Sequence, residues 1–340
     1  MKNPNISIIV PVYNVENYIS KCLESIVAQT YTDYDVVIVD DASTDNTAQI
    51  IIDFIKKNNL DNFNFFSKPK SGVASTRNFS LNKAKGDWIA FVDGDDWVDP
   101  QYLEVMWSAI KKYDADLCYT GARAYDEEAK CFLDWVSYAE QYGTLPENLD
   151  YLYSYSTLWA HLYKNEIIKK HGISFDENVY CEDSAFDLDY NSVISSFCAT
   201  DDVVYNYRIN RAGQLTSTLV SPLQKARMFN HMQKFLSSFS TEDVINAIPK
   251  NQRLTRVMWN ELYSSVSSDI LKKRYTEVKA RRKAHITKII LKSYKPRSKK
   301  EKIMRFCLKR SYLLLCIFVK AYYSRYEKIR KTKLIGYFSK

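Results

Sequence analysis

Short apolar runs that alternate with helical spacing fill the first 120 residues and constrain the fold more than any other feature of the chain. Each run suits a strand buried on both faces, and each intervening segment repeats apolar residues every three or four positions. We predict strands at residues 6–10, 36–39, 63–66, 88–92 and 115–120, and helices at residues 18–28, 47–55, 73–84 and 100–113. This alternation predicts an α/β fold with a parallel sheet that binds ligands at the carboxyl ends of its strands.

The rest of the chain is less regular. Residues 121–215 are rich in tyrosine and contain a segment that passes from a loop into a helix near Asp183. Residues 216–340 contain few Gly or Pro after Pro249 and are predicted to be helical. A chain of 340 residues exceeds what one compact core usually holds. We therefore expect a main domain in two parts, 1–120 and 121–215, with an extension at 216–340.

Charge is distributed unevenly along the chain. Residues 271–340 contain 24 Lys or Arg and 3 Asp or Glu, a balance of +21. The remaining residues contain 24 basic and 37 acidic side chains, a balance of −13. A basic tail therefore follows an acidic body. Hydrophobic residues make up 46% of the chain, so its composition excludes wholesale disorder.

The seven cysteines and four histidines show neither a disulfide framework nor a structural zinc site, because no CxxC pair occurs. The first residues lack the apolar run of a signal peptide. No stretch reaches the ~18 apolar residues that a membrane-spanning helix needs. We expect a protein of the reducing cytosol.

Acidic side chains gather where the predicted strands end. Asp40 and Asp41 follow the second strand, and Asp93, Asp95 and Asp96 follow the fourth. Both groups are expected at the same edge of the sheet, where five carboxylates repel one another unless a cation or a polar ligand compensates. The Asp-Gly-Asp turn suits Mg²⁺ or Mn²⁺ bound partly through a ligand's phosphates. A solvated turn is the simpler alternative, but the second acidic pair argues against it.

The phosphate loops of dinucleotide oxidoreductases and of P-loop NTPases are missing, because the sequence contains neither GxGxxG after the first strand nor GxxxxGK[ST]. A phosphate-bearing ligand must then rely on a metal and on basic side chains. Arg77, at the start of the third predicted helix, is placed for this role. An ordinary surface ion pair explains the same arginine equally well.

Five motifs occur in order: PVYN (residues 11–14), VDDASTDNT (39–47), SGVASTRN (71–78), FVDGDDWVDP (91–100) and CEDSAF (181–186). Together they resemble the family-2 glycosyltransferases, inverting enzymes of the GT-A fold, in particular the bacterial surface-polysaccharide type. The resemblance covers about residues 5–215 and implies a Rossmann-like, mainly parallel nucleotide-binding sheet. It places nucleotide-sugar binding in residues 1–120, and acceptor binding with the catalytic base in residues 121–215.

The resemblance implies a donor site at matching positions. Pro11 and Tyr13 would line the base pocket of a UDP-sugar, and Asp41 would accept the N3–H of uracil. Arg77 would face the same donor, with Lys70 as a weaker candidate.

The same resemblance implies a metal and a base. Asp93 would contact the ribose side of the nucleotide, and Asp93 and Asp95 would hold the Mg²⁺ or Mn²⁺ that bridges the diphosphate. Asp96 would approach the transferred sugar or the acceptor. The Glu182-Asp183 pair resembles the catalytic-base motif, and we assign the base to Asp183. An inverting transfer is a single displacement that needs such a base at the acceptor hydroxyl. The alternative for the pair is an N-terminal helix cap.

Further basic residues follow. The segment VVYNYRINRAGQLT resembles the end of such domains, where Arg208 or Arg211 would reach the donor phosphates or form ordinary ion pairs. The Gln-x-x-Arg-Trp signature of processive members is incomplete, because Gln252, Arg256 and Trp259 are present without adjacent Arg and Trp. We therefore expect one sugar per encounter.

The basic tail interleaves Lys and Arg with short apolar bands, a pattern that suits helices lying on an anionic membrane surface. Packing against the acidic body and a homo-oligomer contact are alternatives. Nucleic acid is not an expected partner, since no RNP, KH or zinc-finger pattern occurs.

These features predict a cytoplasmic glycosyltransferase, peripheral at the inner face of the plasma membrane, that transfers a hexosyl or N-acetylhexosaminyl group. Its acceptor would be a glycan or a lipid-linked molecule, in the synthesis of a capsule, a cell-wall polymer or a lipid-linked oligosaccharide. Two alternatives remain: a non-catalytic nucleotide-sugar-binding module on the membrane, and a nucleotidyltransferase.

Overall fold

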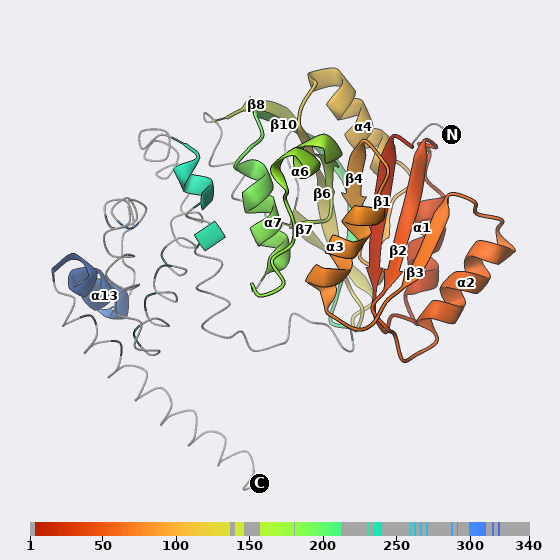
Figure 1. Cartoon of the computed structure of the whole chain (residues 1–340), viewed down its shortest axis with the longest axis horizontal. Helices are drawn as coiled ribbons and strands as arrows, with labels where there is room; N and C mark the ends of the chain where they lie inside the picture. Colours follow the sequence, from red (N-terminus) through yellow and green to blue (C-terminus); the bar gives the residue numbers. More distant parts are fainter. Residues whose placement is uncertain are drawn as a thin grey trace, which may run out of the picture. The chain divides into compact units, whose positions relative to one another are not determined.

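The computed structural model describes residues 4–136, 140–145, 157–179, 181–211, 230–231, 234–239 and 299–310, with single residues at 259, 262, 266, 270, 287, 291, 315 and 319. The chain divides into two compact units (Figure 1). The first comprises residues 1–148, 155–177 and 181–219, and the second comprises residues 149–154, 178–180 and 220–340. All nine residues assigned to a site from the sequence belong to the first unit.

A ten-stranded sheet forms the centre of the first unit. Its main path runs β3-β2-β1-β4-β9-β6-β10-β5, with β7 paired to β6 and β8 paired to β10. The strands are β1 (Ile6–Val12), β2 (Tyr34–Asp40), β3 (Phe63–Ser67), β4 (Trp88–Phe91), β5 (Trp97–Val98), β6 (Leu117–Asp126), β7 (Cys131–Val136), β8 (Gln141–Thr144), β9 (His161–Lys164) and β10 (Ser196–Ile209).

The first four strands form the parallel half that the sequence predicts. β1 pairs in parallel with β2 and with β4, and β2 pairs in parallel with β3. Every residue of β1 and β4 is buried, because helices cover both faces of this half. The carboxyl ends of these strands lie at one edge, with Val12 opposite Asp40 in the register of β1 and β2.

The other half of the sheet is mixed. β9 lies between β4 and β6 and runs antiparallel to both, so β6 and its parallel neighbour β10 point the same way as β1 to β4. Six of the ten strands therefore share one direction, and the prediction of an α/β fold with a mainly parallel sheet is confirmed. The sequence prediction contained no strand at β9, which comes from the irregular middle region.

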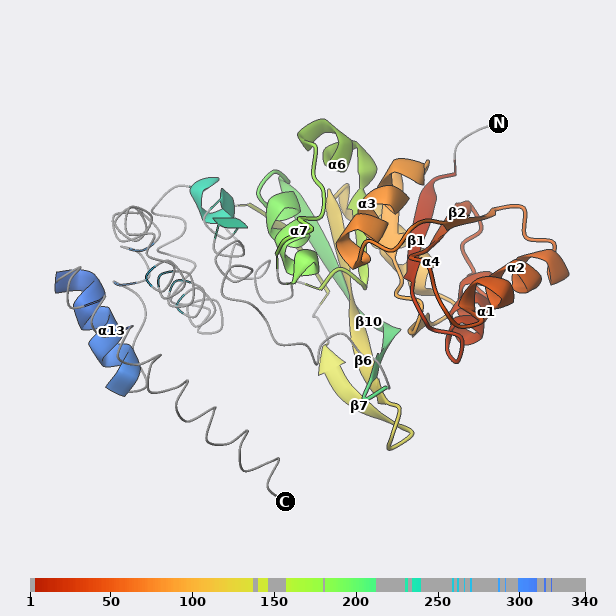
Figure 2. The same ribbon diagram turned by 60° about the horizontal axis from the view of Figure 1, so that its bottom comes forward.

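Helices lie on both faces of this sheet. They are α1 (Ile19–Val27), α2 (Thr47–Lys57), α3 (Val73–Lys83), α4 (Tyr102–Tyr113), α6 (Asn165–His171) and α7 (Glu182–Asn191). Figure 2 shows α1 and α2 on one face and α3 and α6 on the other. This division follows from the right-handed connection of parallel strands. The chain moves in one direction across the sheet from β1 through β2 to β3, and α3 then connects β3 to β4 in the opposite direction, on the other side of β1.

Helix boundaries follow the residue pattern closely. α1 buries Ile19, Cys22, Leu23 and Ile26, which recur at the spacing of one helical face. The prediction that Pro100 is the first helical residue is wrong, because α4 begins two residues later at Tyr102. The backbone carbonyl of Asp99 accepts the N–H of Tyr102, which closes a turn before the helix begins.

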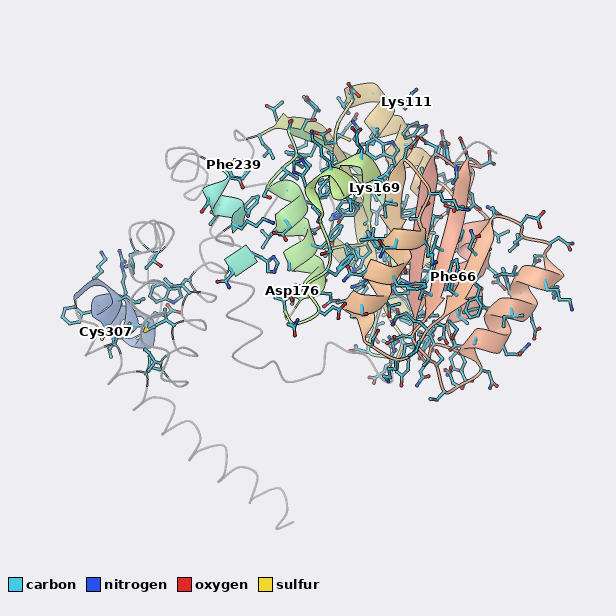
Figure 3. All side chains as sticks on the ribbon, viewed as in Figure 1. Phe66, Lys111, Lys169, Asp176, Phe239 and Cys307 are labelled. Carbon is cyan, nitrogen blue, oxygen red and sulfur yellow. The ribbon has the colours of Figure 1, made fainter. Side chains whose placement is uncertain are left out.

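In the second unit the structure describes α13 (Lys299–Arg310) and a few further residues. Met304, Cys307 and Leu308 are the buried side of α13 (Cys307 is labelled in Figure 3). Trp259 is helical and buried, whereas Gln252 and Arg256 lie outside the described residues. Within the described part of the chain, none of the helices combines the length and the apolar character needed to cross a membrane.

Candidate functional site

A pocket of about 290 Å³ opens at the carboxyl edge of the sheet, in the first unit. Six short segments line it. They are the end of β1, the start of α3, the turn after β4, Trp159 just before β9, the start of α7 and the end of β10 with the residues that follow it. The lining residues are Pro11, Val12, Tyr13, Val15, Val73, Thr76, Arg77, Asp93, Gly94, Asp95, Trp159, Glu182, Asp183, Tyr207 and Arg211.

The structure brings together most of the residues that the sequence nominated. Seven of the nine line the pocket: Pro11, Tyr13, Arg77, Asp93, Asp95, Glu182 and Asp183. Asp41 and Lys70 are not among the lining residues. Of the two later arginines, Arg211 lines the pocket and Arg208 does not.

Arg77 is the central cation of the pocket. It lies on the first turns of α3 and is 5% exposed. Its Nη2 is 2.8 Å from Oδ1 of Asp93, and its Nη1 is 2.7 Å from Oε1 of Glu182. Burial alone would lower the pKa of Arg77, but Asp93, Glu182 and Asp183 together raise it, so the guanidinium stays charged. Its Nε is buried and has no hydrogen-bond partner in the part of the chain that the structure describes.

The turn that follows β4 is held against β1 and β10. A side chain at Gly94 would place its Cβ 2.6 Å from Cγ1 of Val12, so only glycine fits there without a shift. The backbone N–H of Asp93 donates to the Tyr205 hydroxyl at 3.2 Å. The same hydroxyl donates to Oδ2 of Asp96 at 2.8 Å. Tyr205 therefore fixes both ends of this turn.

Asp96, for which the resemblance implies contact with the transferred sugar or the acceptor, lies outside the pocket lining. It is buried, and its Oδ1 accepts the backbone N–H of Arg208 at 2.7 Å. The Arg208 side chain donates to the backbone carbonyl of Asp95 at 2.7 Å and pairs with Glu127. Asp96 and Arg208 therefore stabilise the turn from outside the pocket lining.

Asp95 pairs with Arg211 across the pocket. Burial and the nearby charge of Asp93 raise the pKa of Asp95, and Arg211 opposes that rise. Each carboxylate of the Asp-Gly-Asp turn thus has one oxygen in contact with an arginine, Asp93 with Arg77 and Asp95 with Arg211.

The described residues contain no group of three or more His, Cys, Asp or Glu side chains arranged to hold a metal ion. Two carboxylates on one turn nevertheless fit a divalent cation that takes its other ligands from phosphate oxygens and water. Asp93 and Asp95 offer such a pair on a single turn that lines the pocket. The donor set therefore fits a metal that arrives together with a phosphate ligand.

Asp183 lies one residue after Glu182 at the start of α7. Neither residue is the N-cap, because that position belongs to Cys181, and no side-chain cap hydrogen bond forms there. Oδ1 of Asp183 accepts the backbone N–H of Ser184 at 2.7 Å. Burial, reinforced by Glu182, raises the pKa of Asp183 to about 6 despite the opposing charge of Arg77. A carboxylate with this pKa is suited to accept a proton near neutral pH.

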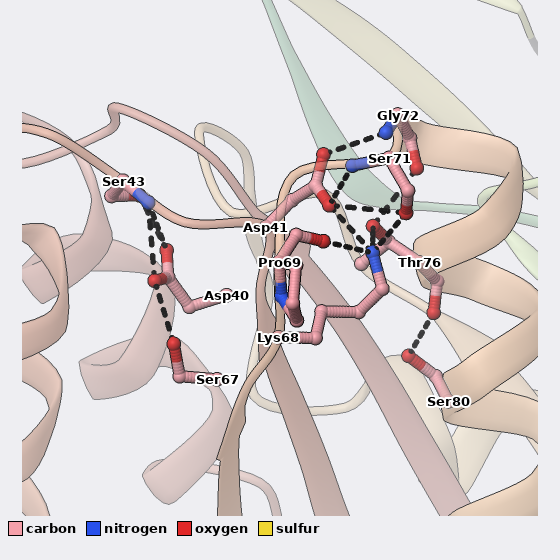
Figure 4. Close-up of polar contacts among 10 residues, drawn as sticks. All are labelled: Asp40, Asp41, Ser43, Ser67, Lys68, Pro69, Ser71, Gly72, Thr76 and Ser80. Carbon is pink, nitrogen blue, oxygen red and sulfur yellow. Dashed lines mark hydrogen bonds and ion pairs between the residues drawn. The ribbon is translucent and has the colours of Figure 1, made fainter.

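Asp41 organises the loop that leads into α3 (Figure 4). Its Oδ1 is 2.6 Å from Nζ of Lys68 and 2.9 Å from the N–H of Ser71, and its Oδ2 accepts the N–H of Gly72 at 2.8 Å. Burial would raise the pKa of Asp41, but Lys68 and the two backbone N–H groups outweigh it and lower the pKa. Gly72, with φ of 94°, then begins α3 in a conformation that favours glycine.

Lys70 lies outside the pocket lining but touches one of its walls. Its Nζ is 3.4 Å from the centroid of the Tyr13 ring, and that ring is exposed. The amine therefore stacks on Tyr13 in a cation–π contact.

Sequence reasoning missed the aromatic wall of the pocket. Trp159 stacks on the rings of Tyr205 and Tyr207, with centroid distances of 4.9 and 5.2 Å. The two tyrosines lie two residues apart on β10 and so share one face of that strand. The spacing of Tyr205 and Tyr207 in the sequence could have indicated that both rings lie on one face of a strand. No pattern in the irregular middle region indicated Trp159.

Comparison with known proteins places this geometry in a family context. Residues 7–160 match the model of Glycosyl transferase family 2. The chain is 29% identical over 222 residues to glycosyltransferase GlyA of Streptococcus pneumoniae, covering 62% of this chain and 31% of the relative. It is 28% identical over 238 residues to the uncharacterized glycosyltransferase EpsJ of Bacillus subtilis, covering 68% and 67%. The chain thus spans from about a third to about two thirds of the length of these relatives.

Solved structures share the fold. Staphylococcus aureus TarS 1-349 in complex with UDP-GlcNAc matches with a TM-score of 0.67 at 19% identity, over 94% of this chain and 92% of that one. Mannosyltransferase PcManGT from Pyrobaculum calidifontis, in complex with GDP-Man and Mn²⁺, matches with a TM-score of 0.51 at 15% identity, over 91% and 89%. The predicted GT-A fold is therefore confirmed.

Proposed function

We propose that this chain, whose residues 7–160 match the model of Glycosyl transferase family 2, is an inverting enzyme that moves one sugar from a UDP-sugar to an acceptor hydroxyl. One observation carries the proposal: Asp183, with its raised pKa, lines the same pocket as Arg77 and the Asp-Gly-Asp turn. A base, a cation and a pair of potential metal ligands are the parts that a single displacement on a nucleotide-sugar needs.

In the proposed reaction the acceptor hydroxyl attacks the anomeric carbon on the side opposite the UDP. The new bond joins the acceptor oxygen to that carbon, and the bond from the carbon to the UDP oxygen breaks. Asp183 takes the hydroxyl proton, while UDP leaves with the electron pair of the broken bond. Arg77 and Arg211 line the pocket and offset the negative charge that develops on the leaving diphosphate. Glu182 positions Arg77 through their ion pair.

Asp93 and Asp95 are the residues that would hold Mg²⁺ or Mn²⁺ together with the donor. A bound cation supplies Lewis-acid stabilisation of the leaving phosphates. PcManGT, which shares the fold, has been solved with GDP-Man and Mn²⁺, and this supports a role for a divalent metal.

The UDP donor is supported by a structural neighbour, since S. aureus TarS has been solved with UDP-GlcNAc. Pro11 and Tyr13 line the pocket at the end of β1, and this supports their proposed contact with the base. Asp41 retains a role at the uracil only through Oδ2, which has one hydrogen bond, because Oδ1 is occupied by Lys68 and Ser71. We propose transfer of a hexosyl or N-acetylhexosaminyl group.

The acceptor is proposed to be a bacterial surface glycan or its lipid-linked precursor. One relative, 29% identical over 224 residues, is named poly(ribitol-phosphate) beta-N-acetylglucosaminyltransferase TarS of S. aureus. This chain spans 38% of that protein. A cell-wall polymer therefore belongs among the first acceptors to test, beside capsule and lipid-linked oligosaccharide fragments.

The donor screen that tests the proposal measures UDP release from a panel of UDP-sugars with Mn²⁺ and these acceptors, followed by the mass of the product. We expect release from one or a few donors and a product heavier by one glycosyl residue. UDP-sugar binding without turnover would favour a non-catalytic module instead. Release of pyrophosphate from UTP would favour a nucleotidyltransferase.

A membrane surface is the partner that α13 supports. Ile303 and Phe306 are exposed, Phe306 by 56%, and they share one stripe of the helix with the exposed Lys302 and Lys309. Phe306 thus lies between two lysines, one turn away on either side, as in helices that rest in an anionic lipid interface. We propose that this stripe holds the enzyme peripherally at the inner face of the plasma membrane.

Vesicle binding of the full chain tests this location. We expect binding to phosphatidylglycerol-containing vesicles and weak binding to pure phosphatidylcholine vesicles. Replacing Lys302 and Lys309 by Gln should weaken binding about fivefold for each lysine, and Phe306→Ser should weaken it further. Phe132→Ser is the matched control, because Phe132 is 51% exposed on β7 of the other unit. Equal binding by all variants would contradict the proposal and leave an oligomer contact as the alternative for this surface.

A further inference from the structure

Three buried side chains link β9 to α7 beneath the start of the helix. Nδ1 of His161 is 2.8 Å from the Tyr163 hydroxyl, and that hydroxyl donates to Oδ1 of Asp187 at 2.5 Å. Asp187 lies four residues after Asp183, so it occupies the same face of α7 one turn further on. The reaction proposed above uses none of these three side chains.

The three side chains are sealed from solvent. His161 and Tyr163 are 0% exposed and Asp187 is 3% exposed. Among the described residues, Oδ2 of Asp187 and Nε2 of His161 are buried and have no hydrogen-bond partner. The Tyr163 hydroxyl is therefore the hydrogen-bond partner that both neighbours depend on. Its removal would leave a carboxyl and an imidazole unsatisfied in the core, which is costly.

Burial disfavours the charged forms of both Asp187 and His161. Burial raises the pKa of Asp187 well above its usual range, the hydrogen bond from Tyr163 opposes this, and the charge of Asp183 adds to it. Burial lowers the pKa of His161 to about 3. From β6, the Tyr119 ring packs edge-on against His161 with centroids 4.4 Å apart. The hydrogen bond from the Tyr163 hydroxyl needs an acceptor oxygen at Oδ1 of Asp187, and the side-chain amide of Asn also provides one.

We propose that Asp187 is a positioning residue for the transfer reaction: by accepting the Tyr163 hydrogen bond it fixes α7 on β9 and holds Asp183 at the pocket. The inference rests on the proposed function, since it assumes that Asp183 is the base. Separate hydrogen bonds hold the C-terminal end of α7, because the Tyr190 hydroxyl accepts the backbone N–H of Lys164 and donates to the backbone carbonyl of Asp116. Of the described hydrogen bonds that join α7 to β9, the one at Asp187 lies nearest to the base.

A pair of substitutions at Asp187 tests the anchor. Asp187→Asn keeps an oxygen that accepts from Tyr163, so kcat should stay within about threefold of the wild type. Asp187→Leu removes the acceptor, and kcat should fall about tenfold or more because a small displacement of a catalytic group is costly. UDP binding should be unchanged in both, since the residues proposed to contact UDP lie on β1, on α3, on the Asp-Gly-Asp turn and at Arg211, outside α7. The pH at which the rate begins to fall on the acidic side should be the same in Asp187→Asn as in the wild type.

Tyr163→Phe removes one hydroxyl and provides a second test if Asp187→Leu does not fold. We expect the same loss of kcat, and no additional loss in the double variant with Asp187→Leu. Tyr102→Phe is the control, because the buried Tyr102 hydroxyl bonds to the carbonyl of Phe91 on β4 rather than to α7. Equal losses in Tyr163→Phe and Tyr102→Phe would overturn the inference, as would equal losses in Asp187→Asn and Asp187→Leu.

Hydrogen exchange separates this inference from the proposed function, since it requires no reaction. Amide exchange in α7 should be faster in Tyr163→Phe and Asp187→Leu than in the wild type, and unchanged in Asp187→Asn. Unchanged exchange in all three variants would overturn the anchor. A wild-type protein that transfers no sugar would instead contradict the proposed function.

Discussion

Arg77 and Glu182 are 105 residues apart in the sequence, yet Nη1 of the arginine lies 2.7 Å from Oε1 of the glutamate. This ion pair joins the first turns of α3 to the first residue of α7. Because Arg77 also binds Asp93, one guanidinium connects the helix that carries the base with the turn that carries the metal-ligand candidates.

Replacement of Arg77 by Leu should destabilise the fold and weaken UDP binding. Asp93 and Glu182 would each lose a charged partner in a partly buried site, and we expect a loss of about 1–3 kcal/mol in the free energy of unfolding. Urea unfolding measures it. Lys112→Leu, which breaks the exposed ion pair with Glu140, is the control and should change stability little. Similar losses in both variants would contradict the bridging role of Arg77.

Transfer should depend on the ionisation of Asp183. Its pKa is raised to about 6, mainly by burial, and a general base must be deprotonated to act. The rate should therefore be at a plateau well above pH 6 and should fall tenfold per pH unit well below it. A pH–rate profile at saturating donor checks this limb. A rate that stays constant between pH 7 and about 4.5 would show that another group accepts the proton.

The same pKa shift has a consequence for stability. A carboxyl whose pKa is higher in the folded than in the unfolded protein binds its proton more tightly when folded. Asp183 therefore costs stability at neutral pH, and this cost disappears as the pH falls through about 6 toward the unfolded value near 4. Asp183→Asn should raise the melting temperature at pH 7.5 and have little effect at pH 4. Thermal unfolding at both pH values measures the difference, and an equal effect at both would contradict it.

The metal ligands can be tested through UDP binding alone. Mn²⁺ should strengthen the binding of UDP to the wild type, and EDTA should abolish that gain. In Asp95→Ala the gain from Mn²⁺ should be largely lost, because one of the two carboxylates on the turn is missing. Titration calorimetry with and without Mn²⁺ measures each affinity. A full Mn²⁺ effect in Asp95→Ala would exclude this carboxylate as a ligand.

The sequence predicts the parallel half of the sheet well because strong local signals coincide there. The runs that became β1, β2 and β4 are apolar throughout, and parallel strands align their carboxyl ends without further information. Because β1 and β4 are parallel neighbours, this geometry brings Tyr13, which follows β1, and Asp93, which follows β4, to the same edge of the sheet. The family motifs then extend the prediction to Asp183, which no local pattern separates from a helix cap.

The sequence does not predict the contacts that depend on β9, the antiparallel strand inserted between β4 and β6. β9 has four residues and is reached through an irregular segment, so no periodicity reveals that it separates β4 from β6. Trp159 and the network around Asp187 depend on that insertion. Asp41 is at the strand end where the sequence predicts it, but its contacts with Lys68, Ser71 and Gly72 come from a loop that no sequence pattern orders.

The central claim, that Asp183 is the base of a UDP-sugar transferase, is tested most directly by comparing wild type and Asp183→Asn with the donor identified by the screen. UDP affinity and UDP release in the presence of acceptor are measured on both proteins. We predict equal affinity for UDP and a loss of transfer of about 10²-fold or more in the variant. Transfer at the wild-type rate by Asp183→Asn, with UDP binding intact, would contradict the account.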